Sequence, residues 1–377
     1  MCSITLVVYA RPQPQCTTIQ PTYFGRLSAR HLNPSEFQRY WCQGVPVIVT
    51  DVNSCFQGNW GPAYFIEQYG GRKVTVQDCE TELTKSTTVA DFFMAYGRPE
   101  TRASILKLKD WPPQTNFNAE FPELFKAFTD AVPIPDMARL DGVMNLAAHF
   151  PHNGIAPDLG PKMYNAYGSP QDSHHHGSTK LHIDITDAVN IMLWAMDGIS
   201  GRPGHAVWHL FKAESAPLIR KFLLDAGISG VGDPIHSQNV YLTPEMLDSL
   251  AAKYDVLPYV IYQHPGEAVF IPAGCPHQVS NEMDAIKIAC DFLSVEHLLQ
   301  TQDLIAQFRY QRIRSTSGDD ILQFYTTLWY AWSSLFSNCS GCPIISEEDD
   351  ISHPSLTSDE HEVAVLTLLP LAPQQQA

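Results

Sequence analysis

The stretch Leu181-His182-Ile183-Asp184 decides the predicted fold and site of this 377-residue chain. It holds two residue types that ligate metals, separated by one apolar residue. Side chains on a β-strand alternate between its two faces, so His182 and Asp184 point to the same side. A second imidazole, that of His277, follows a later apolar segment. Two imidazoles and one carboxylate form the facial triad of non-haem Fe(II) oxygenases, which predicts oxidation by a bound ferrous ion rather than hydrolysis.

The segments around these ligands are apolar and bounded by turns. The run 189–194 (VNIMLW) follows the His-x-Asp pair, and 268–276 (AVFIPAGCP) leads directly into His277. A further segment, 285–292, follows His277 and is apolar apart from one lysine and one aspartate. Short apolar segments of this kind are typical of buried strands. We therefore predict that the ligands lie on or beside strands of one β-structure.

The lysine of segment 285–292 is Lys287, and it allows two interpretations. A lysine on an edge strand that faces water is the usual case. However, Ile286, Ile288 and Ala289 beside it are apolar, so a solvated face is not expected. A buried cation needs an anionic partner to offset its loss of hydration. We favour the interpretation that Lys287 anchors the distal carboxylate of a dicarboxylate co-substrate, 2-oxoglutarate.

The chain divides into four predicted parts. Residues 1–30 are expected to form a loose leader, 31–159 a mixed α/β part, 160–313 the β-barrel core, and 314–377 a C-terminal helix with a disordered acidic tail. Helices are predicted at 34–42, 87–96, 120–131, 215–226, 244–254 and within 294–336. Strands are predicted at 45–50, 180–184, 189–196, 206–211, 259–263, 268–272, 277–281 and 285–292.

Composition and charge exclude several classes of protein. No run of eighteen apolar residues occurs, so we expect no membrane span. The formal net charge of −16 argues against direct binding to DNA phosphates. The same charge fits a basic partner such as a peptide rich in lysine and arginine, although acidity can also serve solubility alone.

Further motifs extend the pattern beyond the three ligands. In chain order they are 45–50 (VPVIVT), 106–113 (LKLKDWPP), 157–168 (PDLGPKMYNAYG), 181–184 (LHID), 207–210 (VWHL), 233–236 (DPIH) and 270–279 (FIPAGCPHQV). Together they resemble the JmjC 2-oxoglutarate oxygenases, and most closely the demethylases that act on lysine 9 of histone H3. The resemblance covers roughly residues 31–313 and rests on several motifs in the same order.

This resemblance implies a fold that is mainly β with helices. The expected architecture is a double-stranded β-helix, a cupin-like jelly roll, with helical decoration at its N- and C-terminal ends. It also implies that His182, Asp184 and His277 hold Fe(II), and that 2-oxoglutarate and O₂ are the co-substrates.

By position, the resemblance implies that Thr179 and Asn190 hydrogen-bond the 2-oxoglutarate. Many JmjC enzymes carry the lysine for this co-substrate on the strand near Val207, where this chain has none. Lys287 therefore stays the predicted anchor.

The segment before the first ligand lines the substrate pocket in relatives, which implies Tyr164, Asn165 and Tyr167 as pocket residues. Packing and hydrogen bonding within the sheet is an equal alternative for each of them.

The activity implied by the resemblance is demethylation of N-methyl-lysine on a histone H3 tail, within chromatin or transcription complexes of the nucleus. A JmjC hydroxylase that leaves a stable alcohol would use the same iron chemistry, and formaldehyde release separates the two. An inactive JmjC scaffold protein is a second alternative, which the intact triad disfavours.

Overall fold

The structure is a computed structural model that describes residues 5–8, 23–113, 115–169, 177–198, 201–228, 232–314, 322–337 and 364–367. Strands β1 (Thr5–Val8) and β15 (Ala364–Thr367) pair with each other in antiparallel fashion. Most of the expected leader and of the acidic tail lies outside the described residues. The division of the chain into four parts stays a prediction.

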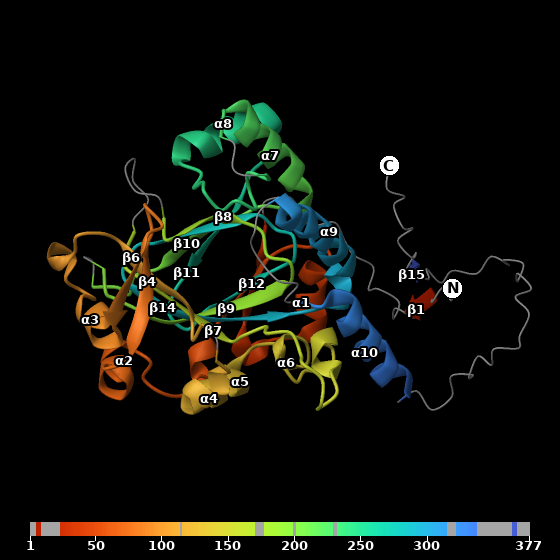
Figure 1. The fold of residues 1–377 in the computed structure, drawn as a ribbon, viewed down its shortest axis with the longest axis horizontal. Helices are drawn as coiled ribbons and strands as arrows, with labels where there is room; N and C mark the ends of the chain where they lie inside the picture. Colours follow the sequence, from red (N-terminus) through yellow and green to blue (C-terminus); the bar gives the residue numbers. More distant parts are fainter. Residues whose placement is uncertain are drawn as a thin grey trace, which may run out of the picture.

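Two β-sheets form the centre of the molecule (Figure 1). The four-stranded sheet has the order β11-β10-β13-β8, and the nine-stranded sheet has the order β2-β3-β12-β9-β14-β7-β6-β4-β5. The strands are β2 (Gly25–Ser28), β3 (Val47–Thr50), β4 (Lys73–Asp78), β5 (Thr84–Thr88), β6 (Leu106–Trp111), β7 (Lys162–Ala166), β8 (Thr179–His182), β9 (Asp187–Ala195), β10 (Ala206–Leu210), β11 (Tyr259–Gln263), β12 (Ala268–Ile271), β13 (His277–Asn281) and β14 (Ala285–Phe292). The fold is mainly β with helices and of the cupin-like jelly-roll type, as predicted.

Apolar side chains from both sheets form one core. Met192 and Val269 come from the nine-stranded sheet, and Trp208, Ile261 and Val279 come from the four-stranded sheet. Because alternate residues of each strand point into this core, the opposite residues are free to face other elements. On β13, His277 lies two residues before Val279, so its side chain points to the same side of the strand as this core.

A second apolar core lies on the other face of the nine-stranded sheet. Helix α1 (Pro34–Trp41) begins after Asn33, whose side chain accepts a hydrogen bond from the Ser35 N–H, as its sequence predicted. Trp41 stacks on Phe292, with ring centroids 5.7 Å apart. The other helices of the N-terminal part are α2 (Pro62–Tyr69), α3 (Val89–Met94), α4 (Phe117–Glu120), α5 (Pro122–Ala131) and α6 (Pro135–Ala138).

The N-terminal part contains strands that the sequence did not predict. Strand β5 occupies the start of the helix predicted at 87–96, and α3 begins only at Val89. The Thr88 side chain accepts a hydrogen bond from the Asp91 N–H and so caps this helix. The prediction of a helix from residue 87 was therefore wrong at its N-terminal end. Strands β4, β6 and β7 were not predicted either.

Two helices stand between β10 and β11 in the chain, α7 (Ala216–Asp225) and α8 (Pro244–Tyr254), and they lie above the four-stranded sheet in Figure 1. Their apolar faces share a core with Leu181 and Ile183, the two neighbours of His182. Helices α9 (Leu298–Arg314) and α10 (Phe324–Ser337) follow β14. Among the helices described, none has the length and apolar character needed to cross a membrane.

Candidate metal centre and co-substrate cavity

The two histidines of the predicted triad face each other across paired strands. His182 ends β8 and lies directly opposite His277, which begins β13, with ring centroids 4.1 Å apart. Asp184 follows β8, so the strand predicted at 180–184 extends two residues too far. Its carboxylate nevertheless lies 3.6 Å from Nε2 of His182 and 3.5 Å from Nε2 of His277. The structure therefore brings all three predicted ligands together.

Main-chain oxygens orient both imidazole rings. Nδ1 of His182 lies 2.8 Å from the carbonyl oxygen of Lys180, and Nδ1 of His277 lies 2.9 Å from that of Cys275. A carbonyl oxygen can only accept, so Nδ1 donates and Nε2 is left as the ligand atom. Burial, reinforced by His182, lowers the pKa of His277 to about 4. The ring is therefore neutral at neutral pH, as a metal ligand must be.

The donor set and its spacing fit a divalent ion. The three ligand atoms all lie within 4.8 Å of one another. Two ligands that meet at a right angle about 2.1 Å from an ion lie about 3 Å apart, so small side-chain movements would complete the coordination. No other trio of His, Cys, Asp or Glu in the described ranges has this spacing. Two imidazoles and one carboxylate leave positions open, which favours Fe(II) over a closed structural zinc site.

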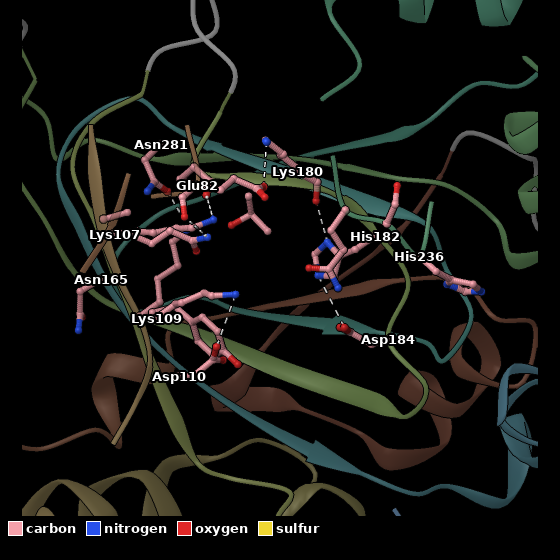
Figure 2. A pocket seen from close by; sticks show the side chains of 18 residues that line it. Glu82, Lys107, Lys109, Asp110, Asn165, Lys180, His182, Asp184, His236 and Asn281 are labelled. Carbon is pink, nitrogen blue, oxygen red and sulfur yellow. Dashed lines mark hydrogen bonds and ion pairs between the residues drawn. The ribbon is translucent and has the colours of Figure 1, made fainter. Parts of the chain in front are cut away.

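The triad adjoins a cavity of about 410 Å³ (Figure 2). His182 and Asp184 line this cavity, together with residues of β6, β7, β13 and β14 and with the segment 236–238. Strands of both sheets therefore contribute to its wall. Clefts that combine open coordination positions with a few polar groups are the usual setting of an active site.

Comparison with known proteins agrees with this geometry. The sequence profile of the family described as "JmjC domain, hydroxylase" matches residues 178–292, a range that contains all three ligands. The chain is a JmjC-domain protein.

Several curated proteins resemble a larger part of the chain. The human protein named lysine-specific demethylase 3A is 35% identical over 344 residues, which cover 79% of this chain and 26% of the relative. Lysine-specific demethylase 3 of Drosophila melanogaster is 34% identical, with 78% and 40% covered. Lysine-specific demethylase JMJ29 of Arabidopsis thaliana is 31% identical, with 76% and 41% covered. The chain thus spans less than half the length of these relatives.

Lys287 lies inside the JmjC domain, on a central strand. Strand β14 pairs with both β7 and β9, and Lys287 is 5% exposed, so the interpretation as an edge-strand lysine facing water is wrong. Nζ donates to Oδ1 of Asn281 at 2.7 Å and lies 5.5 Å from the ring of Trp208. No carboxylate among the described residues pairs with it. Burial lowers the pKa of Lys287 to about 7.

Three further predicted residues line the same cavity, namely Thr179, Tyr164 and Asn165, whereas Asn190 does not. Thr179 lies at the start of β8, and Tyr164 lies opposite Lys287 on β7. Asn190 is not among the lining residues, and its side chain accepts a 3.4 Å hydrogen bond from Nε2 of Gln263. This contact uses only Oδ1, so the role predicted for Asn190 stays a prediction.

The other two predicted pocket residues turn away from the triad. Figure 2 shows Asn165 at the margin of the cavity, away from His182, and its side-chain Oδ1 and Nδ2 are buried without a partner in the described part of the chain. Tyr167 is 3% exposed and belongs to the core below the nine-stranded sheet, where its hydroxyl donates to the Phe92 carbonyl oxygen at 3.1 Å. Tyr167 therefore packs in the core, which was the alternative interpretation of this residue.

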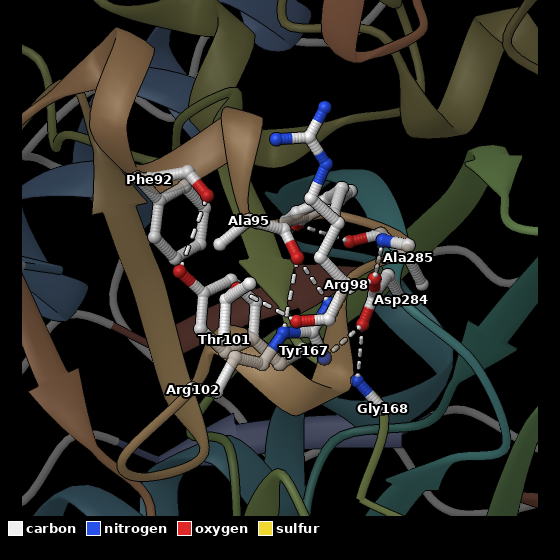
Figure 3. Close-up of polar contacts among 11 residues, drawn as sticks. Phe92, Ala95, Arg98, Thr101, Arg102, Tyr167, Gly168, Asp284 and Ala285 are labelled. Carbon is white, nitrogen blue, oxygen red and sulfur yellow. Dashed lines mark hydrogen bonds and ion pairs between the residues drawn. The ribbon is translucent and has the colours of Figure 1, made fainter.

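A buried ion pair explains the position of Tyr167 (Figure 3). The guanidinium of Arg102 lies 4.1 Å above the Tyr167 ring and makes two hydrogen bonds to Asp284, at the turn before β14. The Asp284 carboxylate also accepts the backbone N–H groups of Gly97 and Gly168, at 2.7 and 2.8 Å. Because all four donors converge on one carboxylate, the end of β7 is fixed to the start of β14.

Sequence reasoning missed most of the charged residues of the cavity. Four lysines and three carboxylates line it. Lys180 pairs with Glu82 at 2.8 Å, and Lys109 lies 3.7 Å from Asp110. Lys107, Lys109 and Asp110 belong to the motif 106–113, which marked the family but gave no role to these residues. The acidic net charge of the chain is therefore not concentrated in this cavity.

Proposed function

We propose that this chain is a Fe(II)- and 2-oxoglutarate-dependent dioxygenase that demethylates N-methyl-lysine on a histone tail, with lysine 9 of histone H3 as the first candidate. One observation carries the proposal. An open His–Asp–His triad and a buried lysine adjoin the same cavity, and no described carboxylate pairs with that lysine. A metal-chelating dicarboxylate needs these two features at its two ends.

The residues divide the work between the metal and the co-substrate. His182 and His277 would hold the ion through Nε2, and Asp184 through its carboxylate. The far carboxylate of 2-oxoglutarate would accept from Lys287, with the Thr179 hydroxyl in the same cavity. When bound, the ferrous ion and 2-oxoglutarate supply O₂-dependent hydroxylation of the methyl group, whose product releases formaldehyde.

Tyr164 is a candidate contact for the methylated ammonium group. Burial, and then the carboxylates of Asp110, Asp291 and Asp184, raise the pKa of Tyr164 well above 10, so its hydroxyl stays protonated. The carboxylate of Asp110, which lines the cavity, would stabilise the positive charge of a methylated lysine, and an aromatic ring attracts the same charge. Asn165 lines the cavity at its margin, away from His182.

The names of the relatives supply the class of substrate, since each is called a lysine-specific demethylase. The histone H3 tail, the nuclear location and the association with chromatin or transcription complexes rest on the resemblance of the motifs. The runner-up is a JmjC hydroxylase with a stable alcohol as its product, because the same cavity would serve both reactions. An inactive scaffold is disfavoured by the complete triad.

A direct test is mass spectrometry of mono-, di- and trimethylated histone H3 peptides incubated with the protein, Fe(II), 2-oxoglutarate and ascorbate. We expect a loss of about 14 Da per methyl group together with release of formaldehyde. A peptide that gains the mass of one oxygen without formaldehyde would establish the hydroxylase. Absence of both products, with no turnover of 2-oxoglutarate, would establish the scaffold.

A further inference from the structure

A second groove, of about 390 Å³, lies next to the cavity of the triad, between residues 73–77 of β4 and residues 107–111 of β6. We call it the β4–β6 groove. It shares four lining residues with the cavity, namely Gln77, Lys107, Lys109 and Asp110. Figure 2 shows Lys109 and Asp110 on the side of the cavity opposite His236. The groove therefore adjoins the cavity at the wall formed by β6.

The groove forms because β4 and β6 stop pairing partway along their lengths. Their ladder ends at the pair of Gln77 and Lys107, although both strands run on for several residues. Beyond this pair β6 is irregular, because its register with β7 shifts after Leu108 and Asp110 has a φ of 53°. An irregular strand bends, so the two strands separate and leave space between them.

Main-chain groups of β4 face this space. The Asp78 N–H donates to the Leu83 carbonyl oxygen on the β5 side, and the Cys79 N–H donates to the Ile105 carbonyl oxygen on the β6 side. Successive residues of a strand direct their main-chain groups to alternate neighbours, so those of Thr75 point toward β6. Thr75 lies beyond the end of the ladder with β6, and an extended peptide can pair with it there.

The groove is positively charged, although the chain is strongly acidic. Lys73, Lys107 and Lys109 line it, and Asp110 is the one acidic residue among its lining residues. The lining thus has two positive charges in excess, on a chain whose formal net charge is −16. Such a lining attracts negatively charged groups and repels lysine and arginine side chains.

We propose that the β4–β6 groove binds the residues on one flank of the methyl-lysine in an extended peptide, and that it selects an anionic side chain, a carboxylate or a phosphate, on that flank. The inference rests on the proposed demethylase function. An extended peptide advances about 3.3 Å per residue, so a groove that adjoins the cavity meets residues within about three positions of the methyl-lysine. The groove thereby adds a charge preference to a reaction whose metal chemistry does not depend on the flanking sequence.

The test uses a histone H3 peptide of residues 1–15 dimethylated at lysine 9. Each of the three positions on either side of the methyl-lysine carries alanine, glutamate, phosphoserine or lysine in turn. The KM is measured by formaldehyde release and the Kd by fluorescence anisotropy. On one flank we expect both constants to be about three- to tenfold lower for a glutamate peptide than for the matching lysine peptide, the range for a few partly exposed charges. Phosphoserine carries more charge than glutamate, so lower constants for phosphoserine identify a phosphate as the preferred group, and the reverse order identifies a carboxylate.

Charge reversal separates the groove from the overall charge of the protein. Lys73 lines the groove but not the triad cavity, so Lys73→Glu should reduce the preference for glutamate over lysine by about threefold or more. Lys85→Glu is the matched control, because Lys85 lies on the neighbouring strand β5 and lines neither space. It should leave the preference unchanged. Both lysines are exposed, so neither substitution should prevent folding.

Equal KM and Kd values for the glutamate and lysine peptides on both flanks would overturn the role of the groove while the demethylase function stands. A loss of preference in Lys85→Glu as large as that in Lys73→Glu would also overturn it, because the effect would then come from the field of the whole protein. Formaldehyde release from no methylated peptide by the unmodified protein would overturn the demethylase function, and this inference with it.

Discussion

Two histidines of this molecule, His277 in the metal centre and His297 before α9, are equally buried but carry different charges. Each is 3% exposed. His277 uses only Nδ1 in a protein hydrogen bond, to a main-chain oxygen, and leaves Nε2 for the metal. His297 uses both nitrogens, with Nδ1 2.6 Å from Oδ1 of Asp187 and Nε2 2.9 Å from the Trp41 carbonyl oxygen. Because both of these partners accept, the geometry favours the doubly protonated, positively charged form of the His297 ring.

The nearby charges account for the difference in pKa. Burial lowers the pKa of His277 to about 4, with a further contribution from His182. Burial acts on His297 in the same direction, but the carboxylate of Asp187 and the bond to Trp41 outweigh it and raise the pKa of His297 above 6.5. Burial alone therefore does not separate a metal ligand from a structural cation, whereas the partner atoms of the ring do.

The two sites are connected through Asp187. Its carboxylate also accepts the Ala273 N–H at 2.8 Å and the Ser294 hydroxyl at 2.6 Å. Ala273 lies in the turn that leads into His277, so the charged pair supports the turn that presents the neutral ligand. Four predictions test this division between a metal centre and a structural support, in order of decreasing effect.

The largest effect is expected at the metal centre. His182→Ala or Asp184→Ala should abolish turnover of 2-oxoglutarate with little change in thermal stability, because each removes a ligand rather than a packing group. Succinate production and thermal unfolding would be measured in parallel. His297→Gln is the control at the other histidine and should retain turnover at temperatures where it is folded. Full succinate production by either ligand variant would contradict the triad.

Substitution in the pair of Asp187 and His297 should lower the stability of the protein rather than abolish turnover. Asp187→Asn leaves the imidazolium of His297 without its carboxylate, and breaking a buried pair costs about 3–5 kcal/mol of unfolding free energy. Urea unfolding measures this loss, while Fe(II) binding at low temperature should persist. The double variant Asp187→Asn/His297→Gln should lose less than the sum of the single variants, because the two side chains form one interaction. Strictly additive losses would show that the pair is not coupled.

The co-substrate end of the cavity should respond through KM alone. Lys287→Met should raise the KM for 2-oxoglutarate by an amount equivalent to roughly 2–5 kcal/mol, because a buried charge-assisted contact is lost. Lys107→Met is the matched comparison in the same cavity, since Lys107 already donates to the Ser178 carbonyl oxygen at 3.1 Å. A larger rise of this KM in the Lys107 variant would show that Lys107, and not Lys287, anchors the co-substrate.

The smallest effect concerns pH. The pKa of His297 is raised on folding, so the stabilisation from its pair with Asp187 is fully present below pH 6.5 and is lost as the pH rises through the folded pKa. The unfolding free energy of the unmodified protein, relative to His297→Gln, should therefore decline as the pH rises above 6.5. A difference that stays constant over this range would mean that His297 is neutral in the folded protein.

Parts of the fold were predictable because their sequences carry a clear pattern. The strands predicted at 259–263, 277–281 and 285–292 match β11, β13 and β14 at both ends. They are short segments bounded by turns, and their apolar residues enter the cores. Strand β5 has the sequence TKSTT, is mostly exposed and lies at the edge of its sheet. It contains no apolar residue, so the hydrophobic periodicity that indicates the other strands is absent.

The site was predictable only where local spacing determines it. The His-x-Asp spacing indicated two of the three residues that meet in the candidate metal centre, and the apolar neighbours of Lys287 indicated its burial. The alternation of side chains along a strand separates Tyr164 from Asn165 and Tyr167, since residues an odd number of positions apart point to opposite faces. The contact of Asn281 with Lys287 depends on how β13 and β14 are placed in the two sheets, which short-range spacing does not indicate.

The ion pair between Arg102 and Asp284 has a consequence for dissecting this protein. Asp284 lies inside the matched JmjC residues 178–292, whereas Arg102 lies well before them. A fragment limited to those residues would keep a carboxylate that is 3% exposed in the whole chain but would lose its guanidinium. It would also lose β7, so β14 would become an open edge able to pair with other chains. A fragment that keeps these contacts must therefore begin before Arg102, well ahead of the residues that match the JmjC family.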